Sequence, residues 1–189
     1  MSDKEITQVA DACSASVGRS GGHSEVTSIT GYYFVQCHDA EGKLKWEDDI
    51  HNLVTTVGKT LTITGALTNA AQGISYMGLK GTGTAAVGDT QASHAGWLEV
   101  GTANAPTYTS PRKTPTWSAA SAGAISPNAA QVFAMTGTGT VAGCFINVGG
   151  TSAIDNTTGT LFSAGDFTGG SKTVSSGDTI SVTYTATAA

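Results

Sequence analysis

The chain has few charged residues. Asp, Glu, Lys and Arg make up 12% of its 189 residues, about half the usual share of roughly 25%. Solvent-exposed helices need charged side chains on their outer face, so this composition argues against a fold built mainly of long helices. The 25 glycines, together with abundant Ala, Ser and Thr, favour short strands joined by tight turns.

Positive charge is scarce as well. The 9 Lys and Arg residues are scattered, and the formal net charge is −5. Nucleic-acid phosphates are bound by clustered Lys and Arg, and the nearest approach to a cluster here is the pair Arg112-Lys113. We therefore expect no nucleic-acid partner. Because a weakly charged surface costs little to desolvate when subunits meet, we expect a homo-oligomer, such as a trimer.

Paired cysteines and long apolar runs are also lacking. Cys13, Cys37 and Cys144 are an odd number at wide spacing, which does not suit a disulfide framework. We expect Cys37 and Cys144 to be free thiols buried in strands, in a reducing cytoplasm. The opening residues, MSDKEITQVADACSAS, contain no apolar signal-peptide core. No run of about 18 apolar residues predicts a membrane helix, so we expect no membrane association.

The sequence does contain many short alternating segments. In SITGYYFVQCH (28–38) the residues Tyr33, Val35 and Cys37 occupy alternate positions, and the final segment GDTISVTYTATAA alternates in the same way. This period of two is typical of half-buried strands. The segment TVAGCFINVGG (140–150) has apolar residues at both odd and even positions, as a strand inside a packed sandwich can have. All four prolines fall between positions 106 and 127, which predicts edge strand and loop there.

These patterns predict an all-β fold, an antiparallel β-sandwich (Ig-like or jelly-roll-like) of about eight or nine strands. At most one short helix is expected, in KTLTITGALTNAAQ (59–72), where the 3.6-residue periodicity is poor and a glycine weakens it. Residues 1–28 have a composition of their own and are interpreted as an extended N-terminal arm. Residues 29–189 are expected to form the β-sandwich domain.

One stretch, GDTQASHAGWLEV (88–100), contains the residue types of a hydrolytic triad: Asp89, Ser93 and His94. Adjacent Ser93 and His94 would point to opposite faces of a strand, and no Gly-x-Ser-x-Gly elbow surrounds Ser93. We interpret Asp89 as a turn residue whose carboxylate accepts hydrogen bonds from nearby backbone N–H groups. Trp97 is expected in the core or an interface. We predict no catalytic residues and no enzymatic activity.

Four further patterns give no clear metal, nucleotide or aromatic binding site. The histidines and cysteines lack metal-ligand spacing, although a site assembled from distant positions stays open. The acidic run EDD (47–49) lacks the alternation of a calcium loop and is interpreted as a solvated end of a strand. GTGTAAVG (81–88) lacks the third glycine of a dinucleotide loop and is interpreted as a glycine loop between strands. Tyr32, Tyr33 and Phe34 are expected in the core. We predict no cofactor and no metal ligand.

Five segments of the chain are distinctive when taken together: GKLKWEDDIHNLVTTVG, YMGLKG, AVGDTQASHAGWLEV, GTLFSAGDF and SSGDTISVTYTATAA. They resemble a known family, the small virion proteins of tailed bacteriophages that are variously labelled capsid decoration, cement, head-fibre or tail proteins. The resemblance covers roughly residues 42–189 and leaves out the predicted arm. Its most specific portions are GDTQASHAGW and the terminal GDxxxVTYT.

The resemblance implies a non-enzymatic virion protein, made in the host bacterial cytoplasm and assembled onto the phage particle, at the head or at the tail. Our leading hypothesis is a capsid decoration (cement) protein that lies on the capsid surface, binds the major capsid protein and stabilises the head. The alternative is a tail or fibre component that attaches to a host receptor. An adhesin should expose a cluster of Trp, Tyr and Asp for sugar binding, whereas a decoration protein should present apolar residues to the capsid. The arm (about 1–25) and the Pro-rich segment 106–127 are the expected contact regions.

Overall fold

The computed structural model describes residues 28–188, so the predicted arm lies outside the described residues except for its last position. The described residues form twelve strands and one helix. In chain order these are β1 (Ile29–His38), β2 (Leu44–His51), β3 (Leu53–Val54), α1 (Thr56–Thr68), β4 (Ser75–Gly83), β5 (Trp97–Val100), β6 (Ala124–Ile125), β7 (Gln131–Ala134), β8 (Gly139–Val141), β9 (Gly143–Val148), β10 (Thr160–Asp166), β11 (Lys172–Val174) and β12 (Thr179–Ala188).

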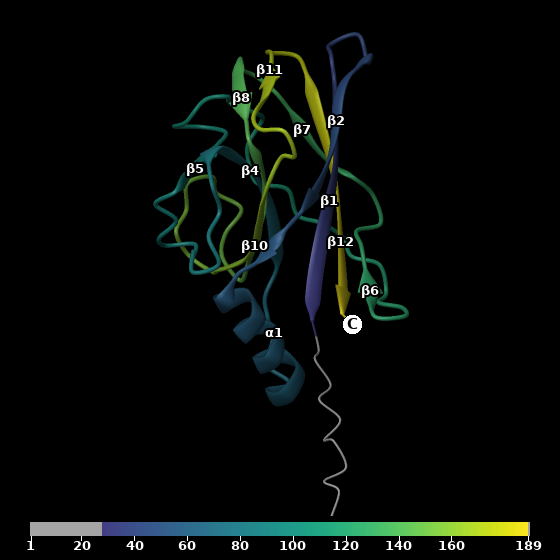
Figure 1. Cartoon of the computed structure of the whole chain (residues 1–189), viewed down its shortest axis with the longest axis vertical. Coiled ribbons are helices and arrows are strands. Elements are labelled where there is room, and N and C mark those ends of the chain that lie inside the picture. Colours follow the sequence, from purple (N-terminus) through teal and green to yellow (C-terminus); the bar gives the residue numbers. More distant parts are fainter. Residues whose placement is uncertain (1–27, 189) are drawn as a thin grey trace, which may run out of the picture.

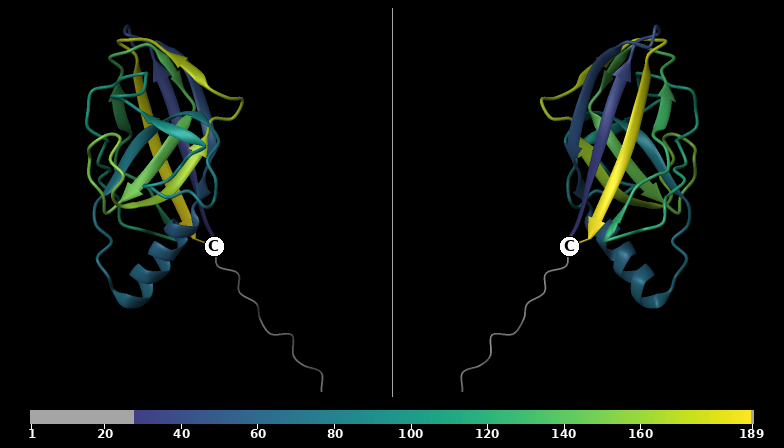
Figure 2. Two further views of the ribbon diagram at one scale, coloured as in Figure 1. Left: turned by 90° about the vertical axis from the view of Figure 1, so that its left-hand side faces the viewer. Right: turned by 90° about the vertical axis from the view of Figure 1, so that its right-hand side faces the viewer.

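The strands form two main antiparallel sheets that face each other (Figures 1 and 2). The first has the order β2-β1-β12-β6, with β7 also paired to β12, and the second has the order β3-β10-β9-β4-β5. A small third sheet pairs β11 with β8. The predicted all-β sandwich is therefore confirmed. The strand count exceeds the expected eight or nine because β3, β6, β8 and β11 have only two or three residues, too few to show an alternating pattern.

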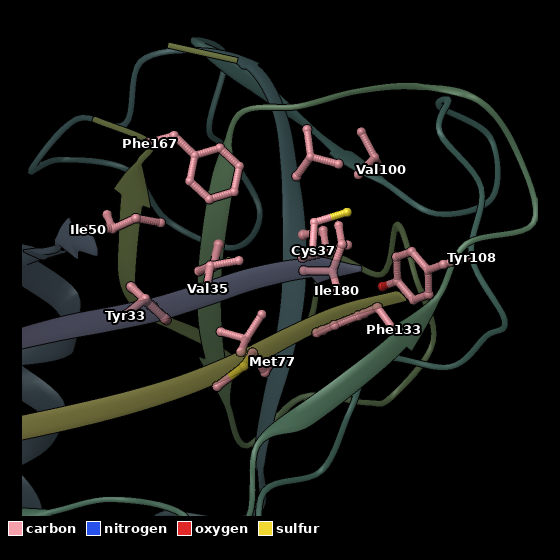
Figure 3. Close-up of a cluster of buried hydrophobic side chains, with 14 of the residues drawn as sticks. Tyr33, Val35, Cys37, Ile50, Met77, Val100, Tyr108, Phe133, Phe167 and Ile180 are labelled. Carbon is pink, nitrogen blue, oxygen red and sulfur yellow. The ribbon is translucent and has the colours of Figure 1, made fainter. Parts of the chain in front are cut away.

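The core lies between the inner faces of the two main sheets (Figure 3). On β1, Tyr33, Val35 and Cys37 are fully buried, and on the neighbouring β12 the same holds for Ile180 and Val182. The alternation predicted for these two strands is thus confirmed. The register pairs them antiparallel from Ile29↔Ala188 to His38↔Thr179, so the buried residues of the two strands lie directly opposite one another, as Val35 does Val182.

Tyr32 departs from the sequence expectation. Its side chain is 37% exposed, whereas Tyr33 is fully buried and Phe34 is half-buried. Successive side chains of a strand point to opposite faces, so three adjacent aromatic residues cannot all enter one core. The hydroxyl group of Tyr33 also bonds Ser163 Oγ of β10, at 2.7 Å, and this hydrogen bond ties the two sheets together.

Strand β9 is buried on both faces, as predicted from apolar residues at both odd and even positions: all six of its residues are buried, including the polar Asn147. One face contributes Cys144, Ile146 and Val148 to the main core. On the other face Phe145 belongs to a second small cluster, with Trp97, Leu161 and Ala164. These residues come from β5, β9 and β10, so the second cluster lies on the face of the second sheet opposite the main core.

The Pro-rich region is loop and edge, as predicted. Between the end of β5 and the start of β6 the chain makes isolated bridges, such as Met77↔Lys113 and Tyr108↔Met135. Pro127 lies just beyond β6, the two-residue strand on the edge of the first sheet. Proline cannot donate a hydrogen bond to a sheet ladder, so this placement follows from its chemistry.

The helix α1 begins and ends with conventional caps and packs through a glycine. Thr55 is the N-cap and accepts a hydrogen bond from the Gly58 N–H at 3.0 Å, while Asn69 ends the helix in the left-handed conformation. A Cβ at Gly58 would lie 2.2 Å from the carbonyl oxygen of Phe162 on β10. Helix and strand therefore approach at a position where a side chain has no room. The helix begins three residues earlier than the segment predicted from the sequence.

Candidate functional site

The Asp-Ser-His stretch forms a turn that holds Trp97 in place. The Asp89 carboxylate accepts hydrogen bonds from the Ala86 N–H and from the Trp97 indole N–H, both at 2.9 Å. Trp97 is 2% exposed. The turn interpretation of Asp89 and the burial of Trp97 are therefore confirmed. The Asp89 carboxylate bonds the indole and a backbone amide, as a structural residue does, and neither contact orients an imidazole.

His94 is likewise engaged by Trp97. Its Nδ1 lies 3.0 Å from the Trp97 carbonyl oxygen, and the two rings stack with centroids 4.0 Å apart. Ser93 closes a tight turn, in which its backbone N–H bonds Thr90. A nucleophilic serine needs a base whose ring nitrogen reaches its Oγ. Here the described contacts of His94 are made with Trp97.

A buried ion pair joins the Pro-rich segment to β5. Arg112 and Glu99 are 1% and 3% exposed, and the guanidinium donates through Nε and Nη2 to the two carboxylate oxygens, at 2.8 and 2.6 Å. Arg112 also donates to the carbonyl oxygens of Thr151 and Asn156, and the Asp155 N–H bonds Glu99. Burial raises the pKa of the Glu99 carboxyl, and the bonds from Arg112 and Asp155 act in the opposite direction. The pair anchors two long loops.

A second buried cation lies where a glycine loop was predicted. Lys80 of β4 is fully buried, and its ammonium group contacts the Asp166 carboxylate of β10 and the Gly83 carbonyl oxygen. In the register, Lys80 pairs with Gly143, and Gly143 pairs with Asp166. Because glycine has no side chain, the lysine can reach the aspartate across β9. The glycines at 81 and 83 thus belong to β4, and the loop begins after them.

The acidic run on β2 is only partly solvated. Glu47 and Asp49 are exposed, but Asp48 is 8% exposed. The Asp48 carboxylate pairs with the Lys172 ammonium group at 2.9 Å and accepts a hydrogen bond from the Thr168 N–H. The interpretation of all three acids as a solvated strand end was therefore wrong for Asp48. Strand alternation turns it inward, where the β10–β11 connection supplies its partners.

Cysteine burial agrees with the sequence expectation within the described residues. Cys37 and Cys144 are free and fully buried, whereas Cys13 lies outside the described residues. Burial raises the pKa of the Cys37 thiol to about 11 and also raises the pKa of the Cys144 thiol. Thiols in this state are poor nucleophiles at neutral pH. Across residues 28–188, no group of three or more His, Cys, Asp and Glu side chains is arranged to hold a metal ion.

The candidate functional site is an apolar pocket at the end of the sandwich that carries α1. It has a volume of about 480 Å³, within the range of roughly 300–1,000 Å³ typical of ligand pockets. Apolar side chains from both sheets and the helix form most of its wall. The principal ones are Leu61, Trp117, Ile125, Ile146, Val148 and Phe162.

Tyr184 and Ala186 of β12 also line this pocket. The Tyr184 ring packs against Trp117, with centroids 6.2 Å apart, and its hydroxyl group accepts a hydrogen bond from Asn52. Burial raises the pKa of Tyr184 to about 12. The described residues that line the pocket include no Asp, Glu, Lys, Arg or His, so the pocket wall is uncharged at neutral pH. The arrangement suits an apolar occupant, because the wall offers little to a charged one.

Exposed apolar side chains gather next to the pocket. Ile63 and Leu67 lie four positions apart on α1, and so on one face of the helix, with 59% and 81% of their surfaces exposed. Ile74, in the connection from α1 to β4, is 58% exposed. The tryptophans are placed differently: Trp97 is buried, and Trp46 and Trp117 are half-buried against Phe167 and Tyr184. Exposed apolar side chains also occur elsewhere, such as Leu98 of β5 and Val132 of β7, at 60% and 51%, but at the α1 end they lie close to the pocket in the chain.

Sequence reasoning missed this pocket and the buried ion pairs. The pocket residues are dispersed over α1, the loop before β6, and strands from both sheets, so no local sequence motif predicts that they lie together. Arg112 was noted only as part of a small basic pair. Its position among the prolines, in a chain with few basic residues, was the available signal.

No helix among residues 28–188 has the length and apolar character needed to span a membrane.

Comparison with known proteins adds no relative: no family model, no curated protein and no solved structure matches the chain.

Proposed function

We propose that the chain is a non-enzymatic structural protein of a bacteriophage virion, and specifically a capsid decoration (cement) protein. Its partners are then the major capsid protein and further copies of itself, and its location is the outer surface of the head. The starting point is the resemblance of residues 42–189 to virion proteins of tailed phages. The structure supplies physical support for an assembly role.

The observation that carries the proposal is the group of exposed apolar side chains on α1 and the connection that follows it. Ile63, Leu67 and Ile74 are more than half exposed, and exposed apolar patches mark interaction surfaces. A sugar site would need exposed aromatic rings beside carboxylates. Trp97 is buried and its indole N–H is bonded to Asp89, whereas Tyr32 is 37% exposed beside the Asp49 carboxylate. The exposed apolar side chains of α1 support decoration, and Tyr32 with Asp49 is the feature that would serve receptor attachment.

The chemistry of the Asp-Ser-His stretch supports a non-enzymatic role. Asp89 bonds an indole and a backbone amide, and His94 contacts the carbonyl group and ring of Trp97. These bonds stabilise a turn. The buried pair Arg112–Glu99, and the pair of buried Lys80 with partly exposed Asp166, likewise fasten loops and strands together, as a rigid clamp between capsid subunits requires.

Copy number in purified virions tests the proposal. The ratio of this chain to the major capsid protein should be measured by quantitative mass spectrometry of particles from the phage that encodes it. Hundreds of copies per particle would support decoration of the head. Three, six or twelve copies would contradict it and favour a tail or fibre component, because tail structures carry small symmetric rings. Absence from the particle would contradict a virion role altogether.

A binding experiment then separates the proposed contact regions. Capsids that lack this protein should recruit the full chain, and the bound fraction should be compared with that of a chain lacking residues 1–25. A surface variant, Ile63→Asp/Leu67→Asp, should bind less than a control, Thr60→Asp/Thr64→Asp, which adds the same charge at exposed polar positions of α1. Equal binding by the two variants would contradict a contact through the exposed apolar face of the helix.

A further inference from the structure

We propose that the apolar pocket at the α1 end is the binding site for the N-terminal segment of the same chain, residues 6–13. This inference does not depend on a virion role. It commits to one occupant, and three features support it: the place where the segment joins the domain, the composition of the segment, and the chemistry of the pocket wall.

The first feature is position. The described chain enters β1 at Ile29, which pairs with Ala188 at the end of β12. Ala186, two residues before Ala188, lines the pocket, and so does Tyr184, whose hydroxyl group lies against Gly31. Figure 1 shows the start of β1, the end of β12, β6 and α1 at one end of the molecule. The preceding segment is therefore attached beside the pocket.

The second feature is the composition of residues 1–27. Residues 6–13 (ITQVADAC) contain Ile6, Val9 and Ala10, and residues 14–25 (SASVGRSGGHSE) are rich in Ser and Gly. A linker of 12 residues with this composition spans about 20 Å on average. Such tethering gives a local concentration on the order of millimolar for a short flexible linker. Even a weak apolar ligand can occupy its site under these conditions.

The third feature is the pocket wall. It is formed largely by apolar side chains, with Ile146 and Val148 at the edge of the main core. Trp117, Ile125 and Leu61 are only half-buried, so further apolar contact would shield them from water. Residues 6–13 bring branched apolar side chains and a single acid, Asp11. This matches an uncharged pocket better than the charged residues at positions 3–5 do.

The thiols allow a direct test on the full chain. Cys37 and Cys144 are fully buried, so a nitroxide reagent at neutral pH should label Cys13, and the Cys13→Ser variant should take up no label. In the ¹⁵N-labelled chain, the nitroxide should broaden the amide signals of Gly65, Gly73 and Ile125 at the pocket. The signal of Gly42, in the β1–β2 turn at the other end of the molecule (Figure 1), should stay sharp.

Two comparisons make the result decisive. Ile6→Asp/Val9→Asp should restore the pocket signals to at least 80% of their diamagnetic intensity, whereas the control Thr7→Asp/Gln8→Asp, which adds the same charge at polar positions, should leave them broadened. Uniformly sharp pocket signals in the labelled natural chain would overturn the proposal. In a mixture of nitroxide-labelled ¹⁴N chain and unlabelled ¹⁵N chain, the pocket signals of Gly65, Gly73 and Ile125 should stay sharp. Broadening of these signals in the mixture would also overturn the proposal, because the occupant would then come from a second copy.

Discussion

The replacement of Arg112 by alanine should be among the most destabilising single changes in the described part of the chain. Arg112 and Glu99 are almost fully buried, and the guanidinium makes two hydrogen bonds to the carboxylate. Without Arg112, the Glu99 carboxylate stays buried with a single bond from the Asp155 N–H. Removal of one partner of a buried ion pair costs about 3–5 kcal/mol, against a total stability of about 5–15 kcal/mol for a typical domain.

The loss of stability in Arg112→Ala has a second cause, the contacts of Arg112 with neighbouring loops. Arg112 also donates to the carbonyl oxygens of Thr151 and Asn156, and each hydrogen bond from a charged group contributes about 1.5–3 kcal/mol. These contributions overlap with the cost of the unpaired carboxylate, so they are not added to it. They do predict that the loop around residues 149–158 loosens together with the Pro-rich segment.

The assay is urea unfolding followed by circular dichroism at pH 7. The midpoint of Arg112→Ala should fall while the slope m stays unchanged. Lys59→Ala, which removes an exposed cation from α1, should change stability by less than about 0.5 kcal/mol. The double variant Arg112→Met/Glu99→Met should recover much of the loss, because it leaves no buried charge.

Two results would refute the prediction that Arg112 and Glu99 form a buried anchor. A loss of less than about 1 kcal/mol in Arg112→Ala would mean that water reaches the pair and screens it, as at an exposed site. If Arg112→Met/Glu99→Met were as unstable as the sum of both single variants, the two side chains would act independently. In either case the pair would not be the buried anchor described above.

Three further predictions concern packing, the turn and pH. In thermal unfolding, Gly58→Ala should destabilise the protein by about 1–3 kcal/mol, because its Cβ would meet a β10 carbonyl group. The control Gly88→Ala, with open space at its Cβ, should leave the stability unchanged. Asp89→Ala should lower the stability by about 1–3 kcal/mol, because it leaves a buried indole N–H unpaired, and it should shift tryptophan fluorescence. Ser93→Ala should change neither the stability nor the fluorescence. A larger loss of stability in Ser93→Ala than in Asp89→Ala would contradict the turn interpretation. The pKa of Cys37 is about 11 when folded, against an ordinary 9.0, so the folded state holds a proton that the unfolded state loses. Stability should therefore fall as pH rises from 9 to 11, and less so in Cys37→Ala, in urea titrations at each pH.

The long alternating strands were predictable from the sequence because their signal is local. In β1 and β12, residues two apart share a face and the core takes one parity, so Tyr33 and Val35 could be assigned to the core from their spacing alone. Strand β9 was recognised by apolar residues at both odd and even positions, and the prolines marked loop and edge because they cannot donate to a ladder. The turn role of Asp89 followed from the short-range hydrogen bonding of its carboxylate.

The tertiary structure decided what depends on distant neighbours. Helix α1 has a weak pattern because it packs on β10 through Gly58, which offers no apolar side chain to mark the contact. Asp48 and Lys80 look like surface charges in the sequence, but Lys172 and Asp166, more than 80 positions away, supply partners that permit their burial. The apolar pocket likewise draws on both sheets and on α1. A sequence pattern records the preferences of neighbouring residues, whereas burial of a charge or formation of a pocket depends on which segments meet in the folded chain.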